Sequence, residues 1–424
     1  MISNVQNINI AEYDYPLPDE RIAKYPLAER DASKLLIYNG LHNNVETCHG
    51  ASLQQDHFRN IGKYLPDNSV LVFNETKVVR ARLQFVKESG AAIEIFCLEP
   101  ITGNGDYQLA FSAGSPVEWH CLVGNSRRWK VGTCRGASVL SMPLKIKGKD
   151  VVLHAERLEK NDAYSTIRFT WEPAEISFAE VLEHAGEIPL PPYLHREAEP
   201  SDRDRYQTVF AKYEGSVAAP TASLHLTKPL IAKLKEQGHT LEEVTLHVGA
   251  GTFRPVATDT IGEHEMHSES IIVKRQTIEH LHNNIGRTII PVGTTSMRTI
   301  ESVYWIGVML MEQGFEERNL HVNQWFPYQE REKLPSAKES LEAILKYLEM
   351  HHLDALHATT ALMIAPSCPI MITKALITNF HQPKSTLLLL VSALIGDKWK
   401  EAYRFALDHG FRFLSYGDSC LFVP

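Results

Sequence analysis

The fold is organised around the stretch from Tyr206 to Glu269, which contains YQTVFAKYEGSVAAPTASLHLT (206–227), VTLHVGAGTFRPV (244–256) and GEHEMHSE (262–269). Apolar residues alternate with polar or small ones over 244–249, the period of a strand with one buried face. This strand runs directly into small residues, where backbone can approach a ligand closely. Side chains that transfer protons or bind ligands are concentrated in the same stretch: His225, His247, His264, Glu265, His267 and Glu269. The stretch therefore predicts a functional site at the end of a strand.

Two further segments show the order strand, loop, helix. RTIIPV at 287–292 precedes Gly293-Thr294-Thr295-Ser296, and ALITN at 375–379 precedes FHQPKST and an apolar helix. Repeated units of this kind indicate an α/β fold whose large domain is built on a largely parallel sheet. Ligands collect at the carboxyl ends of such strands, so we expect these loops to lie at the site.

The residues between 76 and 171 differ from the rest of the chain. Short β-rich runs such as AAIEIFCLE and YSTIRFTW are separated by Gly, Asn and Asp turns, which is typical of a small β-barrel or sandwich. We therefore expect a discontinuous α/β catalytic domain at 1–75 and 172–424, and an inserted small β-barrel domain at 76–171. Three tryptophans are interpreted as the core of the inserted domain: Trp119, Trp129 and Trp171.

Composition limits the class of protein. The 424 residues are 44% hydrophobic and 22% charged, as in ordinary globular proteins. The formal charge of -8 argues against a globally basic nucleic-acid coat but leaves room for a local basic groove. Six cysteines without a CxxC pair indicate a reducing compartment. With no signal-peptide pattern and no apolar run long enough to span a bilayer, we expect a cytoplasmic protein without membrane contact.

Two glycine- or lysine-containing patterns do not fit the nucleotide-binding motifs that they suggest. Gly249-Ala250-Gly251 lacks a third glycine and is soon followed by Pro255, so it is a weak dinucleotide fingerprint. Lys384-Ser385-Thr386 lacks both glycines of a P-loop. The second pattern remains open between a plain helix cap and a helix start that holds a carboxylate or phosphate.

Two clusters of charged or titratable residues also leave alternatives. His264 and His267 are spaced one residue short of the HExxH zinc motif and lack an evident third ligand, so we expect no metal. The alternative to a functional role, for any one of these histidines, is that it simply satisfies a hydrogen bond in the core. Near the N-terminus a second cluster is interpreted as solvated surface rather than as a ligand-facing loop: Arg21, Arg30, Asp31 and Lys34.

Eight strings in order carry a resemblance to a known family: DYPLPDERIAKYPLAERDASKLL (14–36), YQTVFA (206–211), GSVAAPTASLHLT (215–227), VTLHVGAGTFRPV (244–256), HEMHSE (264–269), VGTTSMRTIE (292–301), LITNFHQPKSTLLLLVSA (376–393) and RFLSYGDSCLF (412–422). Together they resemble the S-adenosylmethionine:tRNA ribosyltransferase-isomerase family of queuosine biosynthesis. That family combines an α/β domain with an inserted β-barrel, in agreement with the short β-rich runs and turn residues that begin after residue 75.

The resemblance implies a reaction and its partners. The ribosyl group of S-adenosylmethionine is transferred to 7-aminomethyl-7-deazaguanine in tRNA and isomerised, giving epoxyqueuosine and releasing adenine and methionine. S-adenosylmethionine is a cosubstrate, and no prosthetic group or metal is required. We expect a monomer. Candidates for proton transfer are His247, His267, Glu269 and Asp418. Candidates for substrate binding are Tyr206, Gln207, His225, Thr252, Arg254, His264, Thr295, Arg298, Asn379, His381, Lys384, Ser385, Thr386 and Tyr416.

The chain also departs from the pattern of that family. Ser223 and Leu226 replace Gly and Phe, 365–367 reads APS instead of Tyr-Pro-Gly, and 304–365 is longer and predicts an extra helix. Two alternatives therefore remain. One is a divergent S-adenosylmethionine-dependent transferase with another acceptor, and the other is a non-catalytic RNA-binding protein on the same scaffold.

Overall fold

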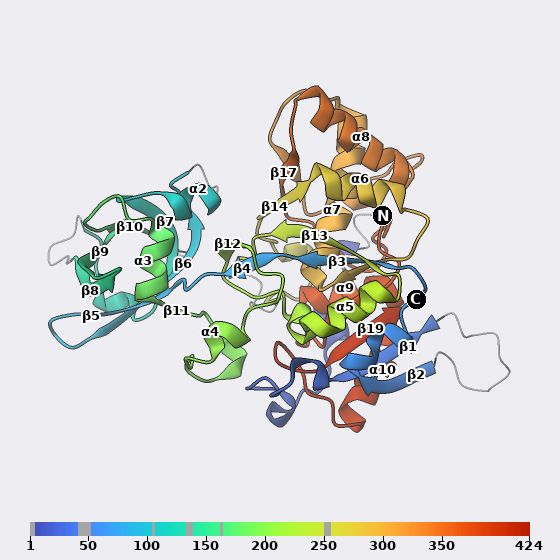
Figure 1. The fold of residues 1–424 in the computed structure, drawn as a ribbon, viewed down its shortest axis with the longest axis horizontal. Coiled ribbons are helices and arrows are strands. Elements are labelled where there is room, and N and C mark those ends of the chain that lie inside the picture. The colour runs from blue at the N-terminus through green and yellow to red at the C-terminus, as the bar shows by residue number, and fades with distance from the viewer. Residues whose placement is uncertain (1–4, 41–51, 104–106, 133–138, 162–163, 250–255) are drawn as a thin grey trace.

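The computed structural model of the chain describes residues 5–40, 52–103, 107–132, 139–161, 164–249 and 256–424. Within this part of the chain, most strands belong to two large sheets, which lie side by side in Figure 1. A two-stranded parallel ribbon, β4 (Thr76–Val78) with β12 (Tyr213–Ser216), lies at the junction between them.

The first sheet has ten described strands. Their order across the sheet is β16 (Leu320–Val322), β17 (Ala355–Thr360), β14 (Glu269–Lys274), β13 (Thr240–Leu246), β3 (Val70–Asn74), β15 (Ile289–Val292), β18 (Leu376–Asn379), β19 (Ser419–Val423), β1 (Lys34–Asn39) and β2 (Ser52–His57). The predicted strands at 244–248, 287–292 and 375–379 lie in the middle of this sheet as β13, β15 and β18.

The sheet is mixed, which corrects the expectation of a largely parallel one. The central strands β13, β3, β15 and β18 are parallel neighbours. β14, however, pairs antiparallel with both β13 and β17, and β19 pairs antiparallel with β18. The alternation in a sequence reveals which face of a strand is buried but not the direction of its neighbour, so this feature was not predictable from the pattern.

Helices cover both faces of the first sheet: α5 (Lys228–Glu236), α6 (Arg275–Asn283), α7 (Thr294–Gln313), α8 (Ala337–Met350), α9 (Thr386–Ile395) and α10 (Lys398–Asp408). α8 is the extra helix that was expected between 304 and 365, and it lies beside α6 and α7 in Figure 1. It begins with a capping box, in which Ser336 accepts from the amide of Glu339. Its apolar face, which includes Leu341, Ile344 and Leu348, is buried.

The second sheet is antiparallel throughout. Its order is β11 (Gly186–Glu187), β5 (Arg82–Val86), β6 (Ala92–Pro100), β7 (Val117–Val123), β10 (Ser165–Thr170), β9 (Lys149–Lys160) and β8 (Leu140–Ile146). The small β-barrel that was expected is thus present in part, as a curled antiparallel half-barrel, because among the described strands no hydrogen-bonded pairing joins β8 to β11.

The core of the second sheet lies under two short helices, α2 (Tyr107–Ser112) and α3 (Phe178–Ala185). The three tryptophans predicted as core are at most 2% exposed and belong to this core. Both β11 and α3 follow residue 171 in sequence yet lie with this sheet. The domain boundaries at 76 and 171 stay a prediction. None of the described helices is long and apolar enough to cross a membrane.

Candidate functional site

Two adjoining cavities lie beyond the carboxyl ends of β15 and β18. The larger has a volume of about 480 Å³ and the smaller about 90 Å³. They share one wall, which is formed by Thr294 and Thr295 at the start of α7 and by Thr386 and Leu387 at the start of α9. The predicted GTTS and PKST segments therefore meet at one place, as the rule for strand ends suggested.

The shared wall begins with a sharp turn after β15. Gly293 adopts φ 100°, a backbone conformation that residues other than glycine rarely adopt. Its N–H donates to the carbonyl of Ile377 at 2.8 Å. α7 starts immediately afterwards, which places Thr294 and Thr295 in its first turn. Thr295 Oγ1 is buried and has no hydrogen-bond partner in the described protein. A ligand in either cavity would find a free hydroxyl there.

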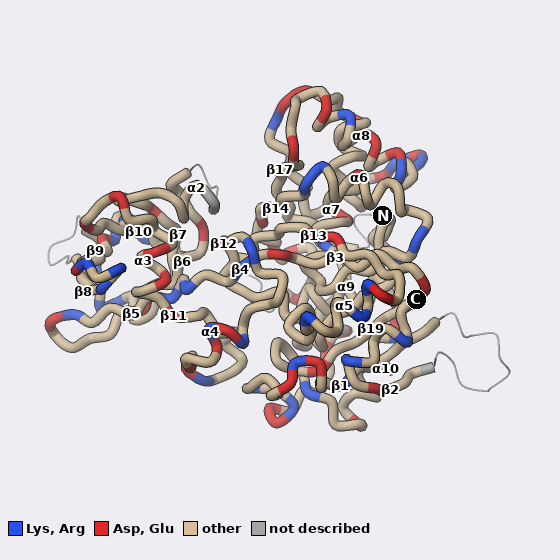
Figure 2. The backbone as a smooth tube through the Cα atoms, in the orientation of Figure 1, with Lys and Arg blue, Asp and Glu red and all other residues tan. Residues whose placement is uncertain are grey.

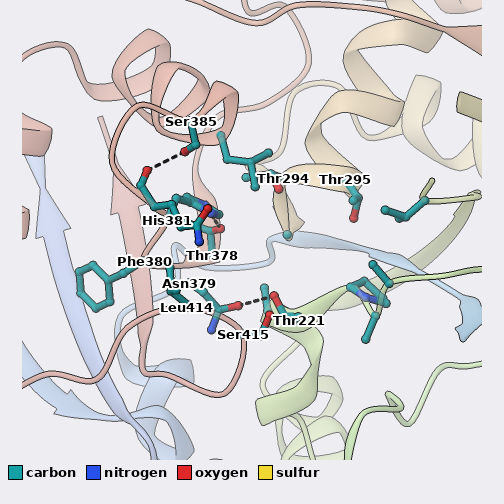
Figure 3. A pocket seen from close by; sticks show the side chains of 18 of the residues that line it. Thr221, Thr294, Thr295, Thr378, Asn379, Phe380, His381, Ser385, Leu414 and Ser415 are labelled. Atoms are coloured by element: carbon teal, nitrogen blue, oxygen red, sulfur yellow. Dashed lines mark hydrogen bonds between the residues drawn. The ribbon is translucent and has the colours of Figure 1, made fainter. Parts of the chain in front are cut away.

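Asn379, at the end of β18, lines the smaller cavity and is held by a chain of hydrogen bonds (Figure 3). Its Nδ2 lies 3.0 Å from Nε2 of His225, and its Oδ1 accepts from Thr221 Oγ1 at 2.9 Å. Nδ1 of His225 faces the carbonyl of Arg30 at 3.4 Å. Burial lowers the pKa of His225 to about 4, so the ring is neutral, with Nδ1 protonated and Nε2 accepting.

His381 also lines the smaller cavity. Its Nε2 lies 3.0 Å from Thr378 Oγ1, and burial lowers the pKa of the imidazole to about 3. In Figure 3, Asn379, His381 and Ser385 come from the C-terminal segment, and Thr294 and Thr295 face them from α7. His381 in the wall of this cavity and His225 behind Asn379 are therefore both neutral imidazoles rather than imidazolium cations.

The PKST turn divides into a helix cap and an ion pair. Ser385 is the N-cap of α9, where its hydroxyl accepts from the amide of Leu388 at 3.2 Å and donates to the carbonyl of Gln382 at 2.7 Å. Lys384 Nζ lies 2.8 Å from Oδ2 of Asp14, and both side chains are half exposed. Lys384 lines neither cavity, and its cation is already paired with Asp14. Ser385 caps the helix, while the binding of a carboxylate or phosphate at this helix start stays a prediction.

A buried carboxylate stands in the wall of the larger cavity. Oε1 of Glu269 accepts from Nε2 of His267 at 3.0 Å and from the amide of Gly249 at 3.2 Å. Oε2 accepts from Nη1 of Arg298 at 2.7 Å. Burial favours the protonated acid, but the Arg298 charge and the His267 hydrogen bond outweigh it, so the pKa of Glu269 lies below its ordinary value. Glu269 is therefore a carboxylate at neutral pH.

The rest of the larger cavity combines polar and apolar surfaces. His264 lines it, and burial together with the neighbouring His267 lowers the pKa of its imidazole. Gln324 holds this loop in place, since its Nε2 donates to the carbonyl of His264 and its Oε1 accepts from the amide of Met266. Apolar side chains complete the wall: Leu362, Met363, Ile364 and Leu390. Such a lining suits an amphiphilic small molecule.

His247 does not line either cavity within the described part of the chain. It is buried, and its ring stacks on Tyr107 of α2 with centroids 5.2 Å apart. A Cβ on Gly215 would lie 2.2 Å from its Nδ1, so the backbone approaches the ring closely. His247 thus contacts the second sheet's helix rather than facing the PKST turn.

Asp418 and Tyr416 serve the fold around the smaller cavity without lining it. Asp418 accepts from the backbone amides of Lys34 at 2.9 Å and Arg412 at 2.8 Å. The Tyr416 hydroxyl donates to Asp202 at 2.8 Å, and Asp202 also pairs with Arg196 at 2.7 Å. The side chains of Asp418 and Tyr416 therefore form their hydrogen bonds with other protein groups.

The remaining predicted residues are distributed between site and scaffold. Tyr206 lines the smaller cavity and packs edge-on against Tyr416, with centroids 5.7 Å apart. Gln207 holds β4 through both backbone groups of Val78, at 3.1 and 2.7 Å. Thr252 and Arg254 lie outside the described residues. Within the part of the chain that the structure describes, no three His, Cys, Asp or Glu side chains are grouped to hold a metal ion.

Several lining residues were not predicted. Thr221 and Ser415 stand inside the GSVAAPTASLHLT and RFLSYGDSCLF strings, so attention to hydroxyls in those strings could have found them. The apolar residues 362–364 carry no local signal, because they come from the end of the long 304–365 stretch. The same holds for Gln324, which fixes the loop at 264–266 without lining either cavity. Ser223, one of the departures, is fully buried at the base of this region.

A mixed α/β scaffold with adjoining polar cavities at strand ends is the arrangement of an enzyme that acts on a small-molecule ligand. The chain belongs to the family described as queuosine biosynthesis protein, whose sequence profile matches residues 10–422.

Relatives match over nearly the whole chain. An S-adenosylmethionine:tRNA ribosyltransferase-isomerase from Syntrophotalea carbinolica is 36% identical over 98% of this chain and 100% of its own length. One of the same name from Carboxydothermus hydrogenoformans is 35% identical with the same coverage. Among solved structures, an S-adenosylmethionine tRNA ribosyltransferase from Thermotoga maritima is 26% identical over 97% of this chain and 99% of that chain, with a TM-score of 0.45.

Proposed function

We propose that this chain transfers the ribosyl group of S-adenosylmethionine to 7-aminomethyl-7-deazaguanine in tRNA and isomerises it to epoxyqueuosine, releasing adenine and methionine. The observation that carries this proposal is membership of the queuosine biosynthesis family along residues 10–422. Relatives named S-adenosylmethionine:tRNA ribosyltransferase-isomerase are 35–36% identical over their full length. The adjoining cavities supply room for a cosubstrate and an acceptor group side by side.

S-adenosylmethionine is proposed to lie across the wall that the two cavities share. Its methionyl carboxylate suits the amino terminus of α7, where backbone N–H groups and the helix dipole favour an anion. The free Thr295 hydroxyl at the same place is a donor for the carboxylate or for a ribose oxygen. Apolar residues 362–364 and Leu390 offer a surface for the less polar parts of the cosubstrate.

His267 is proposed as the base that starts the reaction. The sulfonium of S-adenosylmethionine acidifies the adjacent ribose carbon, so a positioned base can remove a proton there. Because Nε2 of His267 donates to ionised Glu269, Nδ1 is left with the lone pair. His267 is the partly exposed member of the pair, with its side chain 28% exposed against 2% for Glu269. Glu269 would then act as a positioning residue, and Arg298 would keep it ionised.

Neither of the two buried histidines is proposed to exchange protons: His381 lines the smaller cavity, and His225 lies behind Asn379 and positions its amide. With pKa values of about 4 and 3, His225 and His381 stay neutral at physiological pH. A neutral surrounding suits the acceptor amine, which attacks only without its proton. Asn379 and Thr221 provide hydrogen-bonding groups for a purine-like edge at the same place.

The experiment is mass spectrometry of tRNA carrying 7-aminomethyl-7-deazaguanine after incubation with the protein and S-adenosylmethionine, with chromatography of released adenine. We expect one epoxyqueuosine and one adenine per modified tRNA. A protein that binds this tRNA but yields neither product would contradict the proposal. Adenine release that requires some other acceptor would instead support a divergent transferase.

A further inference from the structure

The geometry points to a surface of arginines around α4 (Asp202–Arg205) as the place where the phosphodiester backbone of the tRNA binds. We call it the arginine surface and define it by Arg30, Arg80, Arg203, Arg205 and Arg412. This inference rests on the proposed function, because it assumes that tRNA is the acceptor. It goes beyond that function by locating the contact with the nucleic acid.

α4 brings the arginines of two neighbouring cavities together. Arg203 lines a cavity of about 250 Å³ at the junction of the two sheets, together with Arg80 and Lys77 and with three acidic residues, Glu183, Asp204 and Glu214. Arg205 lines a cavity of about 20 Å³ on the other side, together with Arg30 and Arg412. Figure 2 shows basic residues both on α4 and on the neighbouring segment between β4 and β5.

Most of these guanidinium groups lack an acidic partner. Among the described residues no carboxylate oxygen lies within 4.0 Å of Arg30, Arg80, Arg203 or Arg205, whereas Arg412 contacts Asp418 at 3.4 Å. Backbone carbonyls hold them instead: Arg30 donates to Gln207 at 2.7 Å and to Asp204 at 2.6 Å, and Arg205 donates to Ala28 at 3.0 Å. In a chain with a formal charge of -8, the cavity of Arg30, Arg205 and Arg412 is a local exception, because none of the described residues that line it is acidic.

The arginines also repel one another. Burial and the neighbouring Arg205 lower the pKa of Arg30, and burial and Arg203 lower the pKa of Arg80, although Asp204 offsets part of both effects. Arg30 and Arg205 are thus held close to one another by their hydrogen bonds to backbone carbonyls. A bound anion would relieve this repulsion, and the planar guanidinium fork matches phosphate oxygens.

The shape of the surface favours a polyanion over a single small anion. The cavity beside Arg205 has room for little more than one water molecule, so no base or sugar fits inside it. Phosphates would instead lie along its rim and continue past α4 to Arg80 and Arg203. This path also reaches the proposed active site, because Ser415 lines both this cavity and the smaller cavity of the site.

The test is the affinity of the protein for an anticodon stem-loop as a function of salt, with Arg203→Glu as the first variant. Arg203 is exposed and its side chain makes no hydrogen bond to another described residue, so its replacement should not disturb folding. The matched control is Lys338→Glu, an exposed basic residue on α8 that makes the same change of charge. Arg80→Gln combined with Arg203→Gln tests the same path without introducing a negative charge.

We expect Arg203→Glu to weaken stem-loop binding about tenfold at low salt and to reduce the slope of log Kd against log salt by about 0.7–0.9 per lost phosphate contact. The KM for S-adenosylmethionine should stay unchanged, and Lys338→Glu should bind as the wild type does. If the wild type forms epoxyqueuosine while all variants bind the stem-loop equally well, this inference is wrong and the proposed function stands. If the wild type neither binds nor modifies tRNA, the proposed function itself fails.

Discussion

Nη1 of Arg298 lies 2.7 Å from Oε2 of Glu269, and both side chains are nearly excluded from solvent. One comes from the first turns of α7 and the other from the start of β14, so the contact joins a helix to the strand beside the larger cavity. The pair keeps Glu269 ionised, and the Glu269 carboxylate in turn accepts a hydrogen bond from His267. Under the proposed function, Arg298 therefore supports the orientation of the base from the wall of the same cavity.

Glu269→Gln is expected to destabilise the fold by about 3–5 kcal/mol at pH 7, because it leaves the Arg298 charge buried without a counter-charge. The folded pKa of Glu269 is lowered, so its stabilising effect is complete above the unfolded pKa of about 4.3 and is lost as pH falls through the folded value. Denaturant unfolding from pH 7 to pH 3 should show a steeper acid loss for the wild type. Glu265→Gln, in the same cavity, should behave as the wild type.

His267→Asn is expected to lower kcat by about 10²–10⁴-fold while the KM for S-adenosylmethionine changes little, because a base contributes in the transition state. Steady-state adenine release measures both constants. His264→Asn is the matched control in the same loop and should retain most of kcat. If His267→Asn kept the wild-type kcat, His267 would not be the base.

Thr295→Val is expected to reduce kcat/KM by about three- to tenfold, the contribution of one hydrogen bond to the ligand. Unfolding stability should stay the same or rise, because the hydroxyl is buried without a partner among the described residues. Thr295→Ser retains the hydroxyl and should restore activity. If Thr295→Val lost stability and kept full activity, the hydroxyl would be part of the scaffold alone.

His225→Gln should reduce the pH dependence of stability. The imidazole has a pKa of about 4 in the fold against 6.5 in the unfolded chain, so its contribution is complete above pH 6.5 and is lost as pH falls from there towards 4. The slope attributable to this group is at most about 1.4 kcal/mol per pH unit. Thermal or denaturant unfolding between pH 7 and pH 4 measures it. Equal slopes in variant and wild type would show that His225 is not held neutral.

Lys384→Ala is expected to change the KM for S-adenosylmethionine less than about twofold and stability by less than about 1 kcal/mol, as is usual for a half-exposed ion pair. Asp14→Asn should have the same small effect. A tenfold rise in KM for Lys384→Ala, without a similar rise for Asp14→Asn, would show that Lys384 binds the cosubstrate.

Much of the site was predictable because its residues follow strands. Asn379 ends β18, and Thr295 and Ser385 lie in the segments that follow β15 and β18, so the rule that ligands gather at strand ends is enough to predict that they lie together. His267 and Glu269 are identified by the density of titratable groups in one segment. Their order of action is not evident from that density, since it depends on which ring nitrogen faces the carboxylate.

The candidates that do not line the cavities show what such patterns leave undecided. His247 satisfies the strand alternation, yet its polar face meets Tyr107 from the second sheet, a contact between residues 140 positions apart. Asp418 stands in a conspicuous SYGD string, but its oxygens accept amides of Lys34 and Arg412. A titratable side chain near a loop looks the same in sequence whether its partner is a ligand or backbone.

Local chemistry in the sequence determined the elements and their caps: a strand that includes 244–246, the turn at Gly293, and the capping box of α8 at Ser336 and Glu339. These depend on interactions between residues a few positions apart. Only the tertiary structure decided the strand directions, the charge state of Glu269 and the neutrality of His225. Those properties depend on burial and on partners distant in sequence, such as Arg298 and Arg30, whose proximity no local pattern encodes.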